Sequence, residues 1–242
     1  MMALWAMSPV SLGADLIANW ENFSSLTSTV GDYTMDISGS TNVSNGVLNV
    51  VGANGGSAKV DLSGTKLTLS DGLSINMVVS DVKGCAGIWP HGFTSLAGEN
   101  QNFYLLWGTN ADFDELKAAY NGSATNITTV TEDVGYSAIT GNTPVTLTMT
   151  FSTSKTAIYV NGELAATATA AMDNRAFTYL ALGSWVGASN NGRLSESVHS
   201  LSLYKGAMTA AEVKELVSVP EPTTGTLSLL ALAGLCARRR KH

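Results

Sequence analysis

Apolar and polar residues alternate along most of the chain with the period of two that a half-buried β-strand requires. In VTLTMTF, residues 145–151, the odd positions are apolar and the even positions are all threonine. This pattern predicts an antiparallel strand with one buried face and one face in water. Further strands are predicted for VLNVVG (47–52), AKVDL (58–62), TKLTL (65–69), LSINMVVS (73–80), NFYLLWGT (102–109), TNITTVTE (125–132), TAIYV and ELAAT (156–167), TYLALGS (178–184) and VHSLSLYK (198–205).

Two local signals define how these strands are joined and where they stop. Asn161-Gly162 lies between two predicted strands, and both residue types tolerate the positive φ of a type I′ hairpin turn. Thr209 and Glu212 have the spacing of a capping box, and Val213, Leu216 and Val217 follow at helical spacing. The sequence therefore predicts a tight hairpin and one short helix that closes the body.

The body, residues 15–217, contains no linker or internal repeat that would divide it. About 200 residues of short strands with one terminal helix indicate a single all-β domain, a two-sheet antiparallel sandwich. Charged residues make up only 13% of the chain, about half of the usual quarter. Small polar residues and glycine are abundant, as is typical of secreted and surface β proteins.

The net charge of −6 conceals an uneven distribution. Arg238, Arg239, Arg240 and Lys241 lie together at the C-terminus, and no acidic residue follows Glu221. Without this cluster the body carries a large acidic excess. Such a body repels phosphate backbones, and the sequence therefore excludes nucleic acid as a partner.

The acidic body is followed by a short apolar segment, Leu227 to Ala237, directly before the basic cluster. As a helix, eleven residues rise only about 16 Å, against about 30 Å of hydrocarbon in a bilayer. The segment is therefore too short for a permanent span. The cations would keep this end on the cytoplasmic side of the membrane, with the body outside. The alternatives are a buried C-terminal helix and a misread reading frame.

The order Pro220-Glu221-Pro222, short apolar helix and terminal Arg238, Arg239 and Arg240 resembles the PEP-CTERM sorting signal of Gram-negative bacteria. In that family the signal is recognised and removed by an exosortase, a membrane-embedded transpeptidase. The resemblance implies that residues 218–242 anchor the chain transiently in the inner membrane. It also implies delivery of the body to the envelope, the outer surface or an extracellular matrix.

The N-terminus is apolar up to about Gly13 and then turns polar, with the small residues Ser11, Gly13 and Ala14 at the change. These features predict a truncated signal peptide over residues 1–14. The cationic segment that normally opens a signal peptide is missing, since the first basic residue is Lys59. An N-terminal core strand is the alternative.

The C-terminal third of the body carries a second resemblance. VTLTMTFSTSKTAIYVNGELAATAT and YLALGSWVGASNNGRLSESVHSLSLYKGAMTAAEVKEL resemble the closing strands and helix of laminin-G-like domains. The resemblance covers residues 144–216 and implies a concanavalin A-like jelly roll. That fold includes lectins, carbohydrate-binding modules, adhesion domains and some glycoside hydrolases, so it does not by itself decide the function.

Catalytic motifs are poorly supported. Retaining glycosidases need two carboxylates about 5–5.5 Å apart, and on this scaffold they follow a Glu-x-Asp-x-x-Glu strand pattern that the chain lacks. Asp112 and Asp114 alternate correctly, but no glutamate follows at the required distance. His199 is predicted to be a surface residue of a strand. We therefore expect a protein that is not an enzyme.

Carbohydrate binding is the leading functional hypothesis, because apolar sugar faces stack on aromatic rings while nearby amides and carboxylates bind hydroxyl groups. Three tryptophans lie at predicted turns with such groups beside them. The candidate residues are Trp89, His91, Trp107, Asn110, Asp112, Trp185 and Asn190. A structural or adhesive matrix role without a small ligand is the main alternative, and a glycoside hydrolase of unusual motif is a third.

No cofactor is identified by a motif. Concanavalin A-like domains often hold Ca²⁺ through loop carboxylates, amides and backbone oxygens. Asp112 and Asp114 are the candidate ligands, although their spacing is not diagnostic. The predicted partners are accordingly an exosortase, a glycan or extracellular polysaccharide, and transiently the inner membrane.

Overall fold

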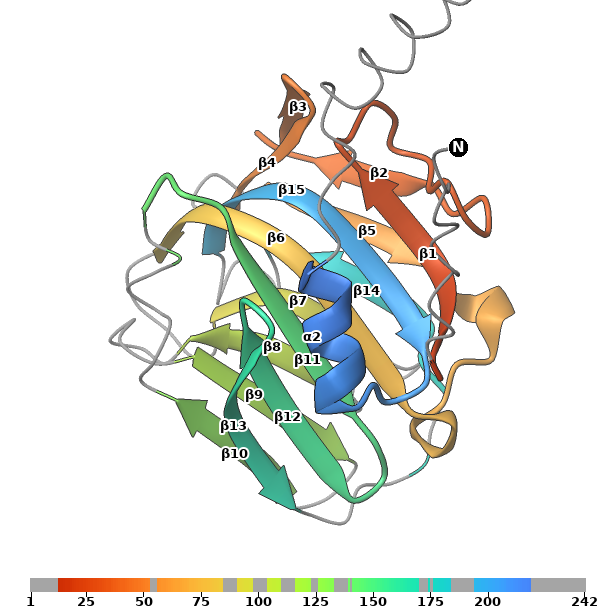
Figure 1. Cartoon of the computed structure of the whole chain (residues 1–242). Helices are drawn as coiled ribbons and strands as arrows, with labels where there is room; N and C mark the ends of the chain where they lie inside the picture. The colour runs from red at the N-terminus through yellow and green to blue at the C-terminus, as the bar shows by residue number, and fades with distance from the viewer. Residues whose placement is uncertain are drawn as a thin grey trace, which may run out of the picture.

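The computed structural model describes residues 13–52, 56–84, 91–97, 104–109, 116–122, 126–132, 139, 141–169, 174, 176–183 and 194–218. For strands β7 to β10 the description is of the backbone. Within this part of the chain the fold is a sandwich of two antiparallel sheets with one α-helix on the outside (Figure 1). The predicted all-β jelly roll is confirmed.

The larger sheet has eight strands, in the order β13-β12-β11-β6-β15-β4-β3, and β1 also pairs with β15. Its strands are β1 (Asp15–Glu21), β3 (Asn42–Ser44), β4 (Val47–Val51), β6 (Leu73–Gly84), β11 (Val145–Phe151), β12 (Lys155–Val160), β13 (Glu163–Thr169) and β15 (Leu194–Lys205). Strand β15 is long enough to pair with β4 through its first half and with β1 through its second half. It therefore joins the N-terminal strand to the centre of the sheet.

The smaller sheet has seven strands, in the order β10-β9-β8-β7-β14-β5-β2. They are β2 (Met35–Ser38), β5 (Ser57–Asp61), β7 (His91–Ala97), β8 (Tyr104–Thr109), β9 (Leu116–Gly122), β10 (Asn126–Glu132) and β14 (Tyr179–Leu182). Two short 3₁₀ helices, η2 (Ser63–Thr65) and η3 (Leu69–Asp71), lead from β5 into β6. The prediction of a strand over residues 65–69 is therefore wrong. Only an isolated bridge from Thr68 to Ala176 forms there.

The main hydrophobic core lies between the two sheets. The inward positions of β6 and β15 alternate with outward ones, as in Leu73, Ile75 and Met77 of β6, which are all buried. Trp20 of β1 is buried on the same side, and its indole nitrogen donates a hydrogen bond to the carbonyl of Leu26 at 2.9 Å. Burying large apolar side chains from both sheets is the main stabilising contribution to the sandwich.

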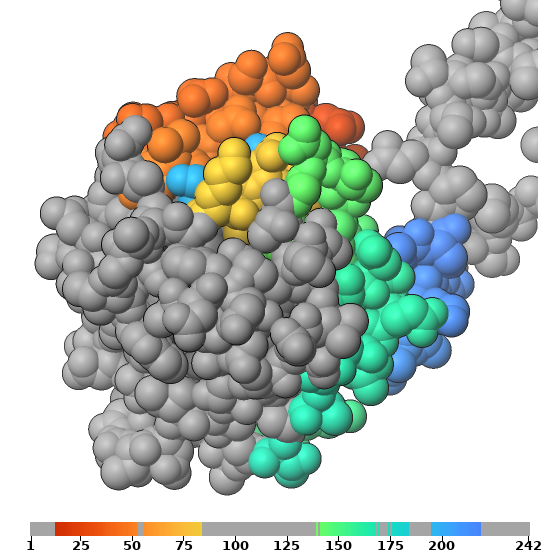
Figure 2. Space-filling view, turned by 90° about the vertical axis from the view of Figure 1, so that its left-hand side faces the viewer, coloured from red at the N-terminus to blue at the C-terminus, as the bar shows by residue number. Residues whose placement is uncertain are grey.

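A second, smaller core lies on the outer face of the larger sheet, beneath α2 (Ala210–Ser218). Tyr159, Tyr204, Met208 and Val213 are buried there. Figure 2 shows α2 (blue) as the outermost layer, beside the β12–β13 hairpin (teal). The helix thus covers part of a face that the sequence pattern alone would assign to solvent.

This cover corrects the expectation for the threonine face of β11. Thr148 and Thr150 are both buried rather than wet. The Thr148 hydroxyl donates a hydrogen bond to the Asn76 side-chain oxygen at 2.8 Å, so its burial leaves no unpaired donor. Alternation predicted the strand correctly, but it could not show that a later helix would cover the polar side.

The capping box of α2 is confirmed. The Glu212 carboxylate accepts a hydrogen bond from the Thr209 amide at 2.6 Å, and the Thr209 hydroxyl accepts one from the Glu212 amide at 3.3 Å. The other carboxylate oxygen of Glu212 accepts the amide of Gly13, just before β1. These contacts join the first described residue of the chain to the start of α2.

The far end of α2 is held against the β12–β13 hairpin. Asn161 and Gly162 both have positive φ, 49° and 82°, as predicted for a type I′ turn. Lys214 of α2 forms an ion pair with Glu163 at 2.8 Å, although both side chains are exposed. The hairpin and the helix therefore support each other at the edge of the sheet.

Candidate functional site

Most residues that the sequence nominated for ligand binding lie outside the described residues. These are Trp89, Asn110, Asp112, Asp114, Trp185 and Asn190, and with them the sorting residues Pro220, Glu221, Pro222, Arg238, Arg239 and Arg240. The two others, His91 and Trp107, lie in β7 and β8, which pair with each other. His91 is opposite Thr109 there, and the description is of the backbone.

The described strands that come before and after the nominated residues end at one end of the sandwich. Gly84, the last residue of β6, pairs with Leu194, the first residue of β15. Likewise His91, the first residue of β7, pairs with Thr109, the last of β8. Figure 2 looks onto this end, where the end of β6 (yellow) reaches the surface beside the start of β15 (light blue). The chain therefore leaves and re-enters the sheets there around each nominated segment.

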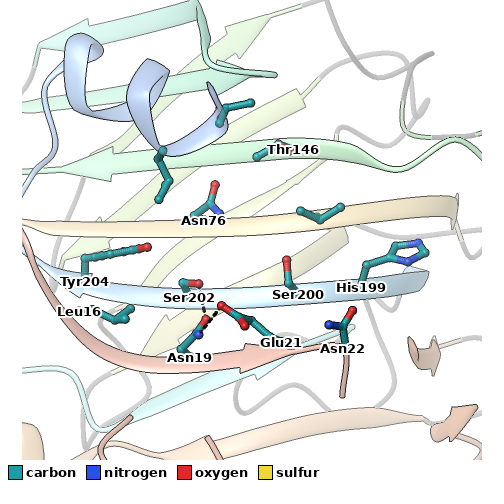
Figure 3. Close-up of a pocket in the computed structure, with 13 residues that line it drawn as sticks. Leu16, Asn19, Glu21, Asn22, Asn76, Thr146, His199, Ser200, Ser202 and Tyr204 are labelled. Atoms are coloured by element: carbon teal, nitrogen blue, oxygen red, sulfur yellow. Dashed lines mark hydrogen bonds between the residues drawn. The ribbon is translucent and has the colours of Figure 1, made fainter. Parts of the chain in front are cut away.

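A groove of about 330 Å³ lies elsewhere, on the outer face of the larger sheet (Figure 3). Its floor consists of outward-facing residues from four neighbouring strands, β1, β15, β6 and β11. Cross-strand pairing places these residues in two adjacent rows. The first row is Asn19, Ser202 and Asn76, and it ends at Thr148, which is buried and does not line the groove. The second row is Glu21, Ser200, Val78 and Thr146.

The two rows form a predominantly polar surface of definite size. Residues two apart on a strand are about 6.6 Å apart, and four strands span about 14 Å. Amide, hydroxyl and carboxylate groups alternate across this area. Short side chains of this kind lose little conformational entropy on binding, because they have few rotatable bonds. The floor is therefore pre-formed for hydrogen bonds to a flat polar ligand.

A chain of hydrogen bonds holds the β1 side of the floor. The Ser202 hydroxyl donates to the Asn19 side-chain oxygen at 2.7 Å, and the Asn19 side-chain nitrogen donates to the Glu21 carboxylate at 2.9 Å. Asn19 is buried, and its backbone amide donates to the Ser28 hydroxyl at 2.6 Å. As Figure 3 shows, this chain turns the Glu21 carboxylate toward the groove.

The β6 side of the floor is held by the bond from Thr148 to the Asn76 oxygen. In this arrangement the carbonyl oxygen of the Asn76 side chain faces Thr148. The Asn76 side-chain nitrogen has no hydrogen-bond partner in the described part of the chain. It is therefore available to donate to a ligand oxygen.

One end of the groove is apolar. Leu216 and Val217 of α2 line it together with Tyr204 and Leu16. Burial raises the pKa of the Tyr204 phenol above its usual value. The Ser202 hydroxyl lowers that pKa, and the negative charge of Glu21 raises it again. The tyrosine is thus a neutral, partly apolar boundary to the groove at physiological pH.

His199 lines the other end, where β15 has a bulge beside Val198 and Ser200. One ring nitrogen of His199 lies 2.9 Å from the Ser80 hydroxyl, in a hydrogen bond whose direction depends on the tautomer. The sequence correctly placed His199 on the outer side of its strand. It gave no indication that the residue borders a groove.

Glu196 of β15 lies on the opposite face of the same sheet, inside the sandwich. Its exposed fraction is 3%, and neither carboxylate oxygen has a hydrogen bond of normal geometry in the described part of the chain. Burial raises the pKa of Glu196 well above its usual range, and the nearby Gly183 amide offsets this only in part. The fold therefore favours a neutral carboxyl at this position.

The groove lining contains one carboxylate among its described residues. Glycoside hydrolysis requires a pair of carboxylates on one side of a cleft, and Glu21 is the single carboxylate among the described residues that line this one. The described residues also contain no group of three or more His, Cys, Asp or Glu side chains that could hold a metal ion. The groove offers hydrogen-bond donors and acceptors with one apolar wall.

The family comparison decides the fold assignment. A family model described as the concanavalin A-like lectin/glucanases superfamily, of laminin G type, matches residues 54–214. The chain belongs to this superfamily. A PEP-CTERM protein-sorting motif matches residues 218–241 of this lectin-like chain. Both resemblances seen in the sequence are thereby confirmed, and the motif marks an exported protein of the cell envelope that an exosortase processes.

Solved structures of the same lectin-like fold come from proteins that differ widely in sequence. Domain 4 of AbnA, an extracellular GH43 arabinanase from Geobacillus stearothermophilus in complex with arabinotriose, is 16% identical with a TM-score of 0.61. The alignment covers 85% of this chain and 99% of that one. At this identity the likeness shows the fold alone. A comparison with curated proteins found no match.

Two botulinum neurotoxin structures are also similar. One is of the type C neurotoxin, whose cell entry depends on interaction with two ganglioside molecules. It is 14% identical with a TM-score of 0.65, and the alignment covers 84% of this chain and 50% of that one. The other is the binding domain of neurotoxin DC in complex with SialylT, at 13% identity, TM-score 0.62 and coverage of 86% and 52%. The lectin-like chain spans about half the length of these toxin chains.

Sequence reasoning missed the groove, although it read the strands that form it. The signal was present in the alternate polar positions of residues 19–21, 74–78 and 200–204. What the sequence does not contain is the order of strands in the sheet, which brings β1 and β11 to either side of β15 and β6. Without that order, the polar faces of four separate strands cannot be recognised as one continuous surface.

Proposed function

We propose that the protein is an exported, non-catalytic glycan-binding module of the cell envelope. The observation that carries this proposal is the groove floor, in which two cross-strand rows present amide, hydroxyl and carboxylate groups beside an apolar wall. Polar groups on a rigid sheet beside an apolar contact are what a saccharide requires, because sugars have hydroxyl edges and apolar ring faces. The lectin-like fold and the saccharide-bound arabinanase domain are consistent with it.

The loop end of the sandwich is a second surface for the same function. We propose that Trp89, Trp107 and Trp185 provide stacking planes there, with the neighbouring amides and carboxylates binding hydroxyl groups. Asp112 and Asp114 are the proposed calcium ligands. A calcium ion at this end would act by ordering the loops rather than by catalysis.

Export is proposed to use both ends of the chain. Residues 1–14 would act as a signal peptide, and the apolar segment within residues 218–242 would hold the chain transiently in the inner membrane of a Gram-negative cell until an exosortase removes it. No helix in the described part of the chain reaches the length and apolarity that crossing a membrane requires. The tail itself lies outside that part.

A glycan array of the purified protein, with calcium and with EDTA, tests the binding function. We expect selective binding to a defined group of saccharides. Loss of that binding in the Ser200→Val/Ser202→Val double variant would assign it to the groove, and loss in Trp89→Ala or Trp185→Ala would assign it to the loop end. Release of reducing ends from any bound saccharide would contradict a non-catalytic role. A blank array in both conditions would favour a structural matrix role instead.

A further inference from the structure

We propose that the groove binds a sugar unit that carries a protonated amino group, with the Glu21 carboxylate as the partner of the ammonium. This inference rests on the proposed glycan-binding function and specifies the ligand of one of its two surfaces. It arises from the charge of the groove lining. The described lining residues include one carboxylate, Glu21, and no lysine or arginine.

Glu21 supplies the formal negative charge of the groove. None of the described residues that line it is a lysine or an arginine. The remaining lining groups are amides, hydroxyls, apolar side chains and His199. A ligand in this groove therefore meets one fixed anion, and no guanidinium or ammonium group balances it.

The carboxylate is held in place before any ligand arrives. One of its oxygens accepts the hydrogen bond from Asn19, whose own position is fixed by Ser202 and Ser28. The second oxygen has no hydrogen-bond partner in the described part of the chain. A carboxylate that is oriented by one hydrogen bond and free at its other oxygen is arranged to accept a further charged donor.

The position of Glu21 in the second row also matches a sugar substituent. Glu21 lies opposite Ser200 at the edge of the floor, beside the first row with Asn19 and Ser202. A ring that donates and accepts hydrogen bonds over Asn76 and Ser202 would extend an equatorial substituent toward one of these edges. An ammonium at that substituent gains both a charge and up to three donors.

The same charge opposes acidic sugars. A uronate or a sulfated sugar would bring a second negative charge within a few ångströms of Glu21, and the groove offers it no lysine or arginine. The acidic excess of the body adds repulsion over a longer range. The nearby Glu21 charge and the long-range field of the acidic body therefore both disfavour binding of acidic polysaccharides in this groove.

The test compares three oligosaccharides of equal length: glucosamine, N-acetylglucosamine and galacturonic acid oligomers. Binding to the purified full chain is measured by calorimetry at about pH 5.5, because the neighbouring oxygens hold the pKa of a sugar amine below that of an ordinary α-amino group, about 7.7–8.0. We expect the glucosamine oligomer to bind about tenfold more tightly than the acetylated one, a difference of about 1.4 kcal/mol. We expect no binding of the galacturonic acid oligomer.

Two charge variants separate the local effect from the net charge. Glu21→Gln keeps an oxygen that can accept the Asn19 hydrogen bond but removes the charge, and it should abolish the tenfold preference. Asp36→Asn removes the same charge from an exposed position on β2, in the other sheet, and should leave the preference unchanged. Added salt should reduce the preference of the native protein, since screening weakens a partly exposed ion pair.

The outcomes distinguish this inference from the function on which it rests. Equal binding of glucosamine and N-acetylglucosamine oligomers, with loss in Ser200→Val/Ser202→Val, would overturn the amino-sugar assignment and leave glycan binding intact. Tight binding of the galacturonic acid oligomer at the groove would also overturn it. If no saccharide binds at all, both the inference and the proposed function are wrong.

Discussion

Asn76 has two separate tasks, and a single substitution would confuse them. Its side-chain oxygen satisfies the buried Thr148 hydroxyl, while its nitrogen faces the groove. Asn76→Ala should weaken saccharide binding and also destabilise the fold by about 1–3 kcal/mol, because it leaves a buried hydroxyl unpaired. Loss of binding in this variant would thus be ambiguous by itself.

The double variant Asn76→Ala/Thr148→Val resolves the ambiguity. Valine replaces the hydroxyl by a methyl group of similar size, so no unpaired polar atom remains. We expect its melting temperature to return most of the way to the native value while saccharide affinity stays low. Thermal melting and calorimetry on both variants check this. Recovery of affinity together with stability would show that Asn76 has only a structural task.

Glu196 is expected to make stability depend on pH. Its pKa is raised in the folded state by burial, so the folded chain holds the proton more tightly than the unfolded chain. The stabilisation from the protonated carboxyl is complete below the unfolded pKa of about 4.3. It is lost as the pH rises through the higher pKa of the folded state.

Glu196→Gln should remove this dependence, because the amide is neutral at every pH. Keeping a buried carboxyl protonated at neutral pH costs free energy that a neutral amide of the same shape does not require. Each kcal/mol of that free energy corresponds to about 2–4 °C in the melting temperature of a domain of this size. We therefore expect the variant to melt several degrees higher than the native protein at neutral pH and nearly equally at acid pH. Melting curves across pH check it. A lower melting temperature at neutral pH would mean that the carboxylate has a charged partner.

At the scale of single elements, the helix that closes the fold was predicted from the sequence. Its packing over the sheet was not. The sequence showed the Thr209 and Glu212 capping box, and the structure confirms it. The same sequence could not show that α2 would cover Thr148 and Thr150, because that depends on how the helix lies across β11 and β12. Local hydrogen bonding is encoded within four residues, whereas packing depends on the whole chain.

The capping box should also determine how firmly α2 is attached. Thr209→Ala removes one cap bond and should cost about 1 kcal/mol. Glu212→Ala should cost more, because Glu212 also accepts the Gly13 amide and so holds the start of β1. Glu215→Ala, on the exposed side of the same helix, is the control. Thermal melting and hydrogen exchange of the α2 amides measure the series, and equal exchange in all three variants would contradict it.

The Glu212 contacts also have a pH dependence with the opposite sign to that of Glu196. The Thr209 amide lowers the pKa of the Glu212 carboxyl, burial raises it in part, and the Gly13 amide and the Thr209 hydroxyl lower it further. The contribution is therefore present above the unfolded pKa and lost as the pH falls through the lowered pKa of the folded state. Acidification should loosen α2.

At the scale of the whole molecule, the fold could be predicted from the sequence, whereas the groove could not. Strand alternation, the Asn161-Gly162 turn and the closing helix were sufficient to indicate a two-sheet antiparallel sandwich. The resemblance of residues 144–216 to laminin-G-like domains then implied a concanavalin A-like jelly roll, which the family comparison confirms. The groove rows combine residues such as Asn19, Asn76 and Ser202, which are far apart in sequence. Only the sheet order makes them neighbours, and no local pattern encodes that order.

The sorting motif leads to a prediction for the full chain. Replacing Pro220, Glu221 and Pro222 by alanine should remove the recognition element while leaving the folded body unchanged. We expect a full-length species to accumulate in the membrane fraction of a host with an exosortase, seen by immunoblotting of fractions. A native chain that keeps its tail in such a host would contradict the assignment.

The order of elements along the chain also has a mechanical consequence. The sorting motif begins at residue 218, where α2 ends, and Leu216 and Val217 of that last turn form a wall of the groove. If the tail is held as proposed, a force on the body would pass through this turn before it reaches either sheet. Tension would peel the helix away from Tyr204 and open the groove from one side, whereas a ligand seated there would resist the pull. If the proposed tether and the proposed ligand site both exist, they would be coupled through about one turn of helix.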